Sequence, residues 1–279
     1  ESALGYAAAR MICRVGAPTA GHGGLLRWGL RPLLSRRPWG HRAIFETRAY
    51  YDRVFGELGP GEVLEWYNID WELLAPSWAP LLASPGSPPP SRLLDLGCGT
   101  SRLATQLAAS ETLGAGTSGR ASRIVCGVDI SPAAVEVQRA MHRATAGGRA
   151  AGGPRCRFAV ADAAEGLPFR SGAFSVVLEK GVLDALCSSA RGEARAEAML
   201  REAWRMLAKG GVLLSASQGF PGRSRLDFIG KAGLSPPPLE VRELSGLPQR
   251  GVRCYQLVKP LRANGAGRDV MTKEIPEQK

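Results

Sequence analysis

Short apolar runs that alternate with helix-like segments dominate the middle of the chain. The strand-like runs lie at residues 92–96, 123–129, 156–160, 174–181 and 211–217. Helix-like segments lie near 100–110, from Pro132 onward and from Ala194 to Leu207. Ser131 precedes Pro132 as an N-cap precedes the first helical position. This alternation predicts a parallel α/β sheet.

The segments that flank this core complete the predicted architecture. Two further strand-like runs, at 239–244 and 252–258, follow one another without a helix, which indicates an antiparallel hairpin added to the sheet. The expected fold is therefore a Rossmann-like α/β fold, with a seven-stranded, mostly parallel sheet and helices on both faces. A segment at 48–82 has helical and aromatic character, and a linker rich in proline, serine and glycine at 83–92 follows it.

The amino-terminal residues carry most of the excess positive charge. The formal net charge of the chain is +11, and residues 1–50 hold eight arginines against two glutamates. No acidic residue lies between Ser2 and Phe45. This composition is typical of a mitochondrial transit peptide, so we expect residues 1–47 to be a leader and the protein to lie in the mitochondrial matrix. A disordered basic arm that binds nucleic acid or lipid is the alternative.

Composition argues against several other classes of protein. No apolar run approaches the ~20 residues that a membrane-spanning helix needs. Outside the leader the chain is only mildly basic, so extended contact with nucleic acid is poorly supported. The six cysteines form no CxxC pair and the chain has three histidines, so we expect neither a disulfide framework nor a metal site.

The loop after the first strand, DLGCGT at residues 95–100, is the most informative motif. Gly97 and Gly99 let the backbone pass close to a ligand because neither residue has a Cβ. A dinucleotide fingerprint would need glycine or alanine where Arg102 stands, and the chain contains no P-loop sequence. Asp95 would repel a pyrophosphate but attract an ammonium group. The turn therefore predicts a nucleoside ligand with a cationic amino-acid tail.

Two more carboxylates follow strands of the same predicted sheet. Asp129 ends the second strand, where a carboxylate can accept hydrogen bonds from both hydroxyls of a ribose. Asp162 follows the third strand, where it can accept from the exocyclic amine of adenine while the backbone of Ala163 meets the ring. A helix-capping role is the alternative for each carboxylate taken alone. Their placement at successive strand ends favours ligand binding.

Four motifs in this order resemble the seven-strand S-adenosylmethionine-dependent methyltransferases. They are LLDLGCGT, GVDIS, VADA and FSVVLEKG, and the resemblance covers residues 48–260, followed by a polar tail at 261–279 that we expect to be flexible. The resemblance implies S-adenosylmethionine as the cofactor. The residues that it implies for cofactor binding are Asp95, Gly97, Cys98, Gly99, Asp129, Ile130, Asp162, Ala163 and Glu179.

The segment EKGVLDAL, residues 179–186, resembles a motif of protein lysine methyltransferases that modify translation elongation factor or mitochondrial citrate synthase. The upstream segment GEVLEWYNIDWELL resembles their amino-terminal Glu-Trp-Tyr helix. Together with the arginine-rich leader, the resemblance implies methylation of a lysine of a mitochondrial protein, citrate synthase. The chain departs from the motif in having Glu179 for aspartate, Val182 for threonine and Asn68 for glycine.

The chemistry of methyl transfer suggests roles for four side chains. We expect Glu179 and Asp184 to orient the incoming lysine amine, while water carries its proton away. We expect Trp66 and Tyr67 to wall the lysine channel through cation–π contact. The alternative for the two aromatic residues is packing of a helix against the sheet. The alternative for Asp184 is a carboxylate at the start of a helix.

Other acceptors, and a role without catalysis, stay open at this point. The fourth strand lacks the Asn/Asp-Pro-Pro-Tyr/Phe segment that is typical of base-amine or glutamine methylation. Another protein such as an elongation factor, or a small molecule, fits the same motifs as citrate synthase. A mitochondrial assembly factor that keeps the fold only as a binding module is the alternative from another class. The intact glycines and three carboxylates argue against it.

Overall fold

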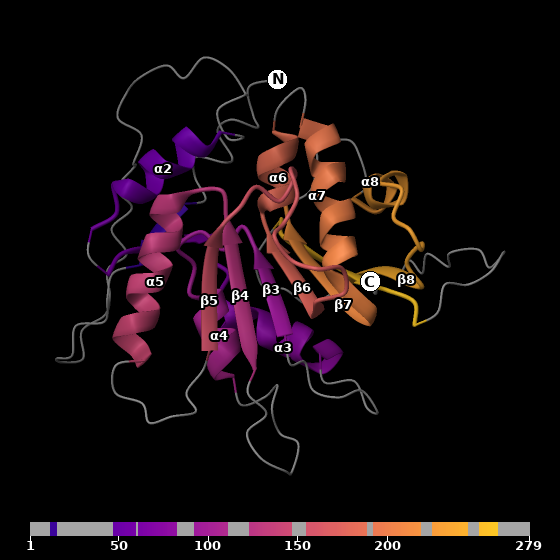
Figure 1. The fold of residues 1–279 in the computed structure, drawn as a ribbon, viewed down its shortest axis with the longest axis horizontal. Coiled ribbons are helices and arrows are strands. Elements are labelled where there is room, and N and C mark those ends of the chain that lie inside the picture. Colours follow the sequence, from indigo (N-terminus) through magenta and orange to yellow (C-terminus); the bar gives the residue numbers. More distant parts are fainter. Residues whose placement is uncertain are drawn as a thin grey trace, which may run out of the picture.

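A seven-stranded sheet forms the centre of the molecule, and helices pack on both of its faces (Figure 1). The computed structural model describes residues 12–15, 47–59, 61–82, 92–110, 123–146, 155–188, 192–218, 225–244 and 251–261. The predicted leader and tail therefore lie almost wholly outside the described residues. Among the helices described, none is both long enough and apolar enough to cross a membrane.

The central sheet is mixed, with five parallel strands and an antiparallel pair at one edge. Its strands are β3 (Arg92–Leu96), β4 (Ile124–Asp129), β5 (Arg155–Val160), β6 (Phe174–Lys180), β7 (Leu207–Ser217), β8 (Glu240–Leu244) and β9 (Arg253–Val258). The spatial order is β5-β4-β3-β6-β7-β9-β8, and β9 runs antiparallel to both β7 and β8. The mostly parallel sheet with a carboxyl-terminal antiparallel hairpin is thus confirmed.

The direction in which the sheet grows reverses between β3 and β6. From β3 the chain adds β4 and then β5 on one side, whereas β6 and β7 lie on the other side. Open α/β sheets bind ligands at such a switch point, outside the carboxyl ends of the strands. The glycine turn follows the carboxyl end of β3, so the topology puts this motif where a ligand is expected.

The described helices form two layers around the sheet. They are α2 (Arg48–Gly56), α3 (Trp71–Leu82), α4 (Leu103–Ala109), α5 (Pro132–Ala146), α6 (Val182–Cys187), α7 (Gly192–Met206) and α8 (Arg225–Lys231). Side chains of α3, α4 and α5 share one hydrophobic core with the sheet, and those of α6, α7 and α8 share the other (Figure 1). In β3, Leu93 belongs to the first core and Leu94 to the second. Burial on both faces explains why the parallel strands are continuous apolar runs.

The helix that follows β4 begins where the sequence predicted. α5 starts at Pro132, and the Ser131 hydroxyl accepts the Ala134 N–H at 3.3 Å. This bond satisfies one of the free N–H groups of the first turn, as an N-cap does.

The end of α7 differs from its prediction. The helix ends at Met206, whereas the sequence suggested that it reaches the turn at residues 209–211. These residues belong to β7 instead. The reason is pairing with the segment after β9, because Gly210 donates to the Lys259 carbonyl at 3.0 Å and Lys259 donates to the Gly211 carbonyl at 2.9 Å.

The Glu-Trp-Tyr segment is not the helix that the sequence predicted. Val63–Trp66 form strand β2, which pairs antiparallel with β1 (Ile12–Val15). Tyr67 and Asn68 follow with φ of 64° and 55°, which makes a left-handed turn. The prediction was wrong because long-range contacts fix this segment. The Leu64 N–H, for example, donates to a hydroxyl of the glycine turn at 2.8 Å.

Candidate active site

The glycine turn is a rigid loop at the carboxyl end of β3. Gly97 and Gly99 have φ of +65° and +47°, conformations that residues with a side chain rarely adopt. The Gln138 side chain of α5 donates to the Gly99 carbonyl at 3.0 Å and to a second carbonyl of the turn at 2.7 Å. The Cys98 N–H donates to the carbonyl of Val128 on β4 at 3.0 Å. These bonds hold the turn in place before any ligand arrives.

Asp95 lies two positions before the first glycine, on β3. It is 2% exposed, and its Oδ2 has no hydrogen-bond partner among the described residues. Burial raises the pKa of this carboxyl to about 7, while the Lys180 ammonium lowers it. A buried acceptor without a donor is costly, and it becomes favourable when a cationic donor binds to it. Asp95 therefore offers a buried acceptor to a cationic donor.

Asp129 ends β4 and faces the same turn. One carboxylate oxygen accepts the Gly99 N–H at 2.8 Å, and the other accepts the Ser131 N–H at 2.9 Å. Burial raises the pKa of Asp129 to about 6, and hydrogen bonds from these N–H groups and from Ile130 lower it. Each carboxylate oxygen has a second lone pair, so Asp129 keeps the capacity to accept from hydroxyl groups.

Asp162 lies after β5 at the same edge, next to Ala163. Its Oδ1 accepts the Ala164 N–H at 2.9 Å, and its Oδ2 forms an ion pair with Arg195 of α7 at 2.5 Å. A ligand amine at Asp162 would therefore have to share the carboxylate with Arg195. Nothing in the local sequence around Asp162 pointed to this partner 33 residues away.

Glu179 reaches the edge from β6, in register with Leu96 of β3. It is 1% exposed, and burial raises its pKa to about 7 while the Ser215 hydroxyl lowers it. Its Oε2 accepts the N–H groups of Val182 and Leu183 at 3.1 and 3.3 Å, and its Oε1 accepts the Ser215 hydroxyl. The carboxylate thus accepts the free N–H groups in the first turn of α6, which is a structural role.

Comparison with known proteins decides the family. The sequence model of a family described as "Methyltransferase domain" matches residues 89–228. The chain belongs to this family. It is an S-adenosylmethionine-dependent methyltransferase.

Three relatives show which members of the family are similar. The mitochondrial citrate synthase-lysine N-methyltransferase of Danio rerio is 27% identical over 249 residues, which cover 82% of this chain and 92% of the relative. The Homo sapiens protein of the same name is 32% identical over 185 residues, with 62% and 71% covered. EEF1A lysine methyltransferase 4 of Mus musculus is 30% identical over 180 residues, with 62% and 61% covered.

In the methyltransferase, Asp184 of α6 forms a cluster with residues from three other segments. It accepts the hydroxyl of Tyr67, the hydroxyl of Ser217 at 2.5 Å and the N–H of Gln218 at 2.7 Å, and it pairs with Arg225. The sequence motifs had singled out Asp184 and Tyr67, which the structure brings into contact. Arg225 was assigned no role from the sequence. Its importance shows only in the structure, where it is buried at the start of the short helix α8.

A second buried ion pair joins β2 to β6. Lys180 pairs with Glu65 and donates to the Ile69 carbonyl at 2.8 Å. Glu65 also accepts the Ser101 hydroxyl of the glycine turn at 2.7 Å. Neither residue of the pair was assigned a role from the sequence. The sequence held one signal of this pair: each of the apolar runs VLEW and VVLEK contains a charged residue.

The two aromatic residues that the sequence grouped together have different surroundings. Tyr67 is buried with its hydroxyl on Asp184, and a Cβ on Gly181 would lie 2.9 Å from that hydroxyl oxygen. Gly181 is therefore needed for the approach of Tyr67. Trp66 is half-buried and packs against two hydrophobic clusters, but from strand β2 and not from the helix that the packing alternative assumed.

Helix α2 packs against the glycine turn and the start of α5, a position that the sequence did not predict. Asp52 of α2 accepts the hydroxyl of Ser131, the N-cap of α5, at 2.6 Å. A Cβ on Gly99 would lie 3.3 Å from the ring of Phe55. The loop and α2 are thus packed against each other, and the small glycine permits the contact.

The charge of this edge fits the cofactor that the family implies. The buried charged residues of the described chain are four carboxylates, Glu65, Asp95, Asp129 and Glu179, and two cations, Lys180 and Arg225. When all are ionised the carboxylates exceed the cations by two, and a bound cation would reduce this excess. S-adenosylmethionine carries a sulfonium and an ammonium group. The Oδ2 atom of Asp95, which has no hydrogen-bond donor among the described residues, is available to accept from such an ammonium group.

Proposed function

We propose that this methyltransferase transfers a methyl group from S-adenosylmethionine to the side-chain amine of a lysine of citrate synthase in the mitochondrial matrix. Three features support the proposal. Relatives of the chain are named as mitochondrial citrate synthase-lysine methyltransferases and as an elongation-factor lysine methyltransferase. The leader has the composition of a transit peptide. The carboxyl edge of the sheet carries an excess of buried carboxylates beside an aromatic residue.

The observation that carries the proposal is the contact between two segments that lie far apart in the sequence. The Glu-Trp-Tyr segment and the segment EKGVLDAL meet at the end of β6. Tyr67 donates to Asp184 across 117 residues of chain, and Lys180 pairs with Glu65 across 115. Both segments carry the resemblance to lysine methyltransferases, and their contact supports the proposal that they form one wall of the site.

The proposed cofactor contacts divide between the strand ends. The carboxylate of Asp95 would hold the ammonium group of the amino-acid tail, and that of Asp129 would accept from the ribose hydroxyls beside Ile130. Asp162 would accept from the adenine amine, with Ala163 against the ring. Residues 97–99, including Cys98, would provide the backbone of the turn. When bound, S-adenosylmethionine supplies a methyl group on a positively charged sulfur.

The acceptor lysine has to reach the edge as a neutral amine. Its usual pKa is about 10.4, so deprotonation near pH 8 costs roughly 3 kcal/mol. We propose that Tyr67 and Trp66 line the approach of the lysine and that Asp184 holds the Tyr67 ring in place. Glu179 acts as a positioning residue because its oxygens already bind α6 and Ser215. A water molecule takes the proton, since a carboxylate by itself stabilises the ammonium form.

The same proposal divides the chain into three parts. Residues 1–47 would be the mitochondrial leader, residues 48–260 the methyltransferase domain and residues 261–279 a polar tail. A fusion of residues 1–47 to a fluorescent protein should co-localise with mitochondria in cells. Diffuse fluorescence would remove the leader from the proposal.

The proposal is tested by incubating the full chain with purified citrate synthase and S-adenosylmethionine labelled in its methyl group. Mass spectrometry should find the label on a lysine of citrate synthase, and Asp129→Ala should abolish it. Label only on another protein, such as an elongation factor, would keep lysine methylation and remove citrate synthase. Bound cofactor without labelled protein would favour a small-molecule acceptor or a binding module.

A further inference from the structure

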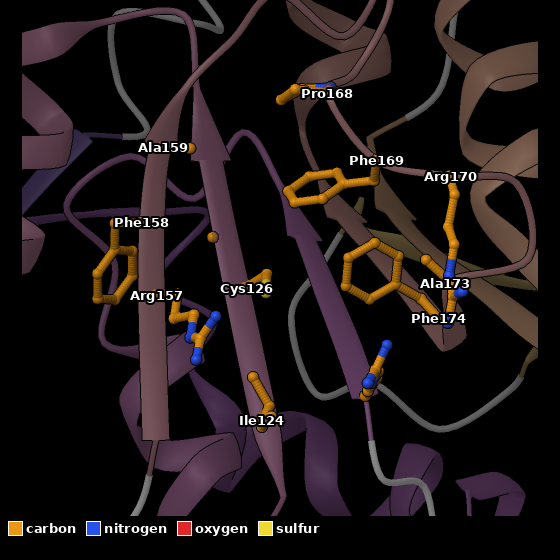
Figure 2. Close-up of a pocket in the computed structure, with 12 residues that line it drawn as sticks. Ile124, Cys126, Arg157, Phe158, Ala159, Pro168, Phe169, Arg170, Ala173 and Phe174 are labelled. Carbon is orange, nitrogen blue, oxygen red and sulfur yellow. The ribbon is translucent and has the colours of Figure 1, made fainter.

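A groove of about 540 Å³ lies on the sheet face that α6 and α7 leave open (Figure 2). It runs over β4, β5 and the start of β3, and residues 168–174 form its other side. The groove exists because the connection from β5 to β6, residues 161–173, contains no helix. Helices α4 and α5 share the core on the opposite face, while α6, α7 and α8 pack near β6 and β7.

The floor of the groove is apolar. Ile124 and Cys126 of β4 and Ala159 of β5 contribute apolar side chains, and none of the three is fully buried. The rings of Phe169 and Phe174 lie edge to face, with centroids 5.1 Å apart, and they face the strands in Figure 2. This surface is able to bury one or two apolar side chains of a partner.

Three arginines surround this apolar floor. Arg92 begins β3. Arg157 lies on β5, and Arg170 lies in the connection beside Phe174 (Figure 2). All three are exposed, and no guanidinium among them has a hydrogen bond or ion pair with another described residue. Among the described residues that line the groove there is no carboxylate. By contrast, Arg195 and Arg205 each lie 2.5 Å from a carboxylate.

We propose that this groove docks an acidic segment of the protein substrate that also carries apolar side chains. Charge complementarity determines the occupant. Three arginines that have no acidic partner among the described residues favour two or three carboxylates beside an apolar residue. A protein segment is the fitting source, because the arginines come from two strands and a loop and lie at the rim of an open surface. The proposal rests on the proposed protein-lysine methylation.

One end of the groove, at Arg92 and Ile124, lies away from the reacting edge, while the other end extends along β4 to Gly127 and along β5 to Ala159. Arg92 and Ile124 begin their strands, whereas the glycine turn follows the end of β3. Five residues of β3 span about 16 Å at roughly 3.3 Å per residue. Docking at this distance contributes to acceptor binding and leaves the chemical step unchanged. Substrate recognition would then combine a lysine at the edge with an acidic segment in the groove.

The test compares two triple variants of the full chain. The groove variant is Arg92→Gln, Arg157→Gln and Arg170→Gln. The matched control is Arg143→Gln, Lys209→Gln and Lys231→Gln, which removes the same charge from exposed positions outside the groove. Both should keep the melting temperature and the cofactor Kd of the wild type.

In the methylation assay with citrate synthase, the groove variant should raise KM for the protein by about tenfold, because it loses three ion pairs with the acidic segment. Its kcat should stay unchanged, and the control should keep the wild-type KM. Added salt should raise the KM of the wild type but not that of the groove variant. Equal KM values in the two variants would overturn the proposal.

A binding measurement separates this proposal from the proposed function. A fluorescein-labelled peptide that alternates glutamate with leucine and phenylalanine is titrated with each protein and followed by fluorescence polarisation. If the wild type methylates no protein, the proposed function fails, and peptide binding alone then tests the groove proposal. Binding that weakens about tenfold only in the groove variant supports the groove. Absent or equal binding in all three proteins overturns it.

Discussion

The carboxyl ends of β3 and β6 lie side by side in the sheet, and each brings a buried carboxylate with a pKa raised to about 7. At the end of β6, Glu179 accepts two N–H groups of α6 and the hydroxyl of Ser215. At the end of β3, Asp95 has a buried oxygen with no donor in the part of the chain that the structure describes. The difference separates a carboxylate that holds the fold from one that is ready for a ligand.

The largest expected effect is on the β3 side of this comparison. Asp95→Asn should weaken the binding of S-adenosylhomocysteine, which retains the ammonium group, by about 3–4 kcal/mol, or at least a hundredfold in Kd. The melting temperature should stay equal or rise, because the variant removes a buried charge that has no donor. Isothermal titration and thermal denaturation measure the two quantities. A Kd within threefold of the wild type would contradict the assignment.

On the β6 side, Glu179→Ala should lower stability instead. Val182, Leu183 and Ser215 would lose their acceptor, which costs about 2–3 kcal/mol and lowers the melting temperature by roughly 5–10 °C. Glu179→Gln keeps one acceptor oxygen and serves as the milder control. An unchanged melting temperature for the alanine variant would show that Glu179 is not a structural residue.

A pH series sharpens the comparison without changing the fold. The pKa of Asp95 is raised above its usual range, so between about pH 4 and pH 7 the folded protein binds more protons than the unfolded chain. Stability of the free protein should therefore fall as pH rises through this window. Cofactor affinity should rise about tenfold from pH 6 to pH 8, because the ionised carboxylate binds the ammonium group. The rise should vanish in Asp95→Asn and persist in Glu179→Gln.

The smallest effect concerns the contact between the two motif segments. Tyr67→Phe removes the hydroxyl that donates to Asp184, while Asp184 keeps Ser217, Gln218 and Arg225. We expect a loss of about 1 kcal/mol in stability and a rise in KM for the protein acceptor, with cofactor Kd unchanged. A changed cofactor Kd with an unchanged acceptor KM would place Tyr67 on the cofactor side.

Local pattern was sufficient for the sheet and for the glycine turn. Parallel strands buried on both faces leave continuous apolar runs, and the turn needs glycine at the two positions with positive φ. The Glu-Trp-Tyr segment was predicted as a helix because its contacts are distant. Lys180 and Thr100, which hold Glu65 and Leu64, lie 115 and 36 residues away.

Sequence could nominate the site carboxylates but could not rank them. Asp95 and Glu179 both sit near the end of an apolar strand, so they look equivalent along the chain. Only the structure shows that the Glu179 carboxylate accepts hydrogen bonds from Ser215 and from the start of α6. It also shows that Asp162 forms an ion pair with Arg195. The same holds for α2, whose position over Gly99 depends on Phe55 and on tertiary contacts.

The most direct measurement is a crystal structure of the full chain with S-adenosylhomocysteine bound. The ammonium group should lie about 2.7–3.2 Å from a carboxylate oxygen of Asp95, with the ribose hydroxyls on Asp129. Glu179 should keep its bonds to α6 and Ser215. An ammonium group bound to Glu179, with Asp95 still without a donor, would contradict the division between the two strand ends.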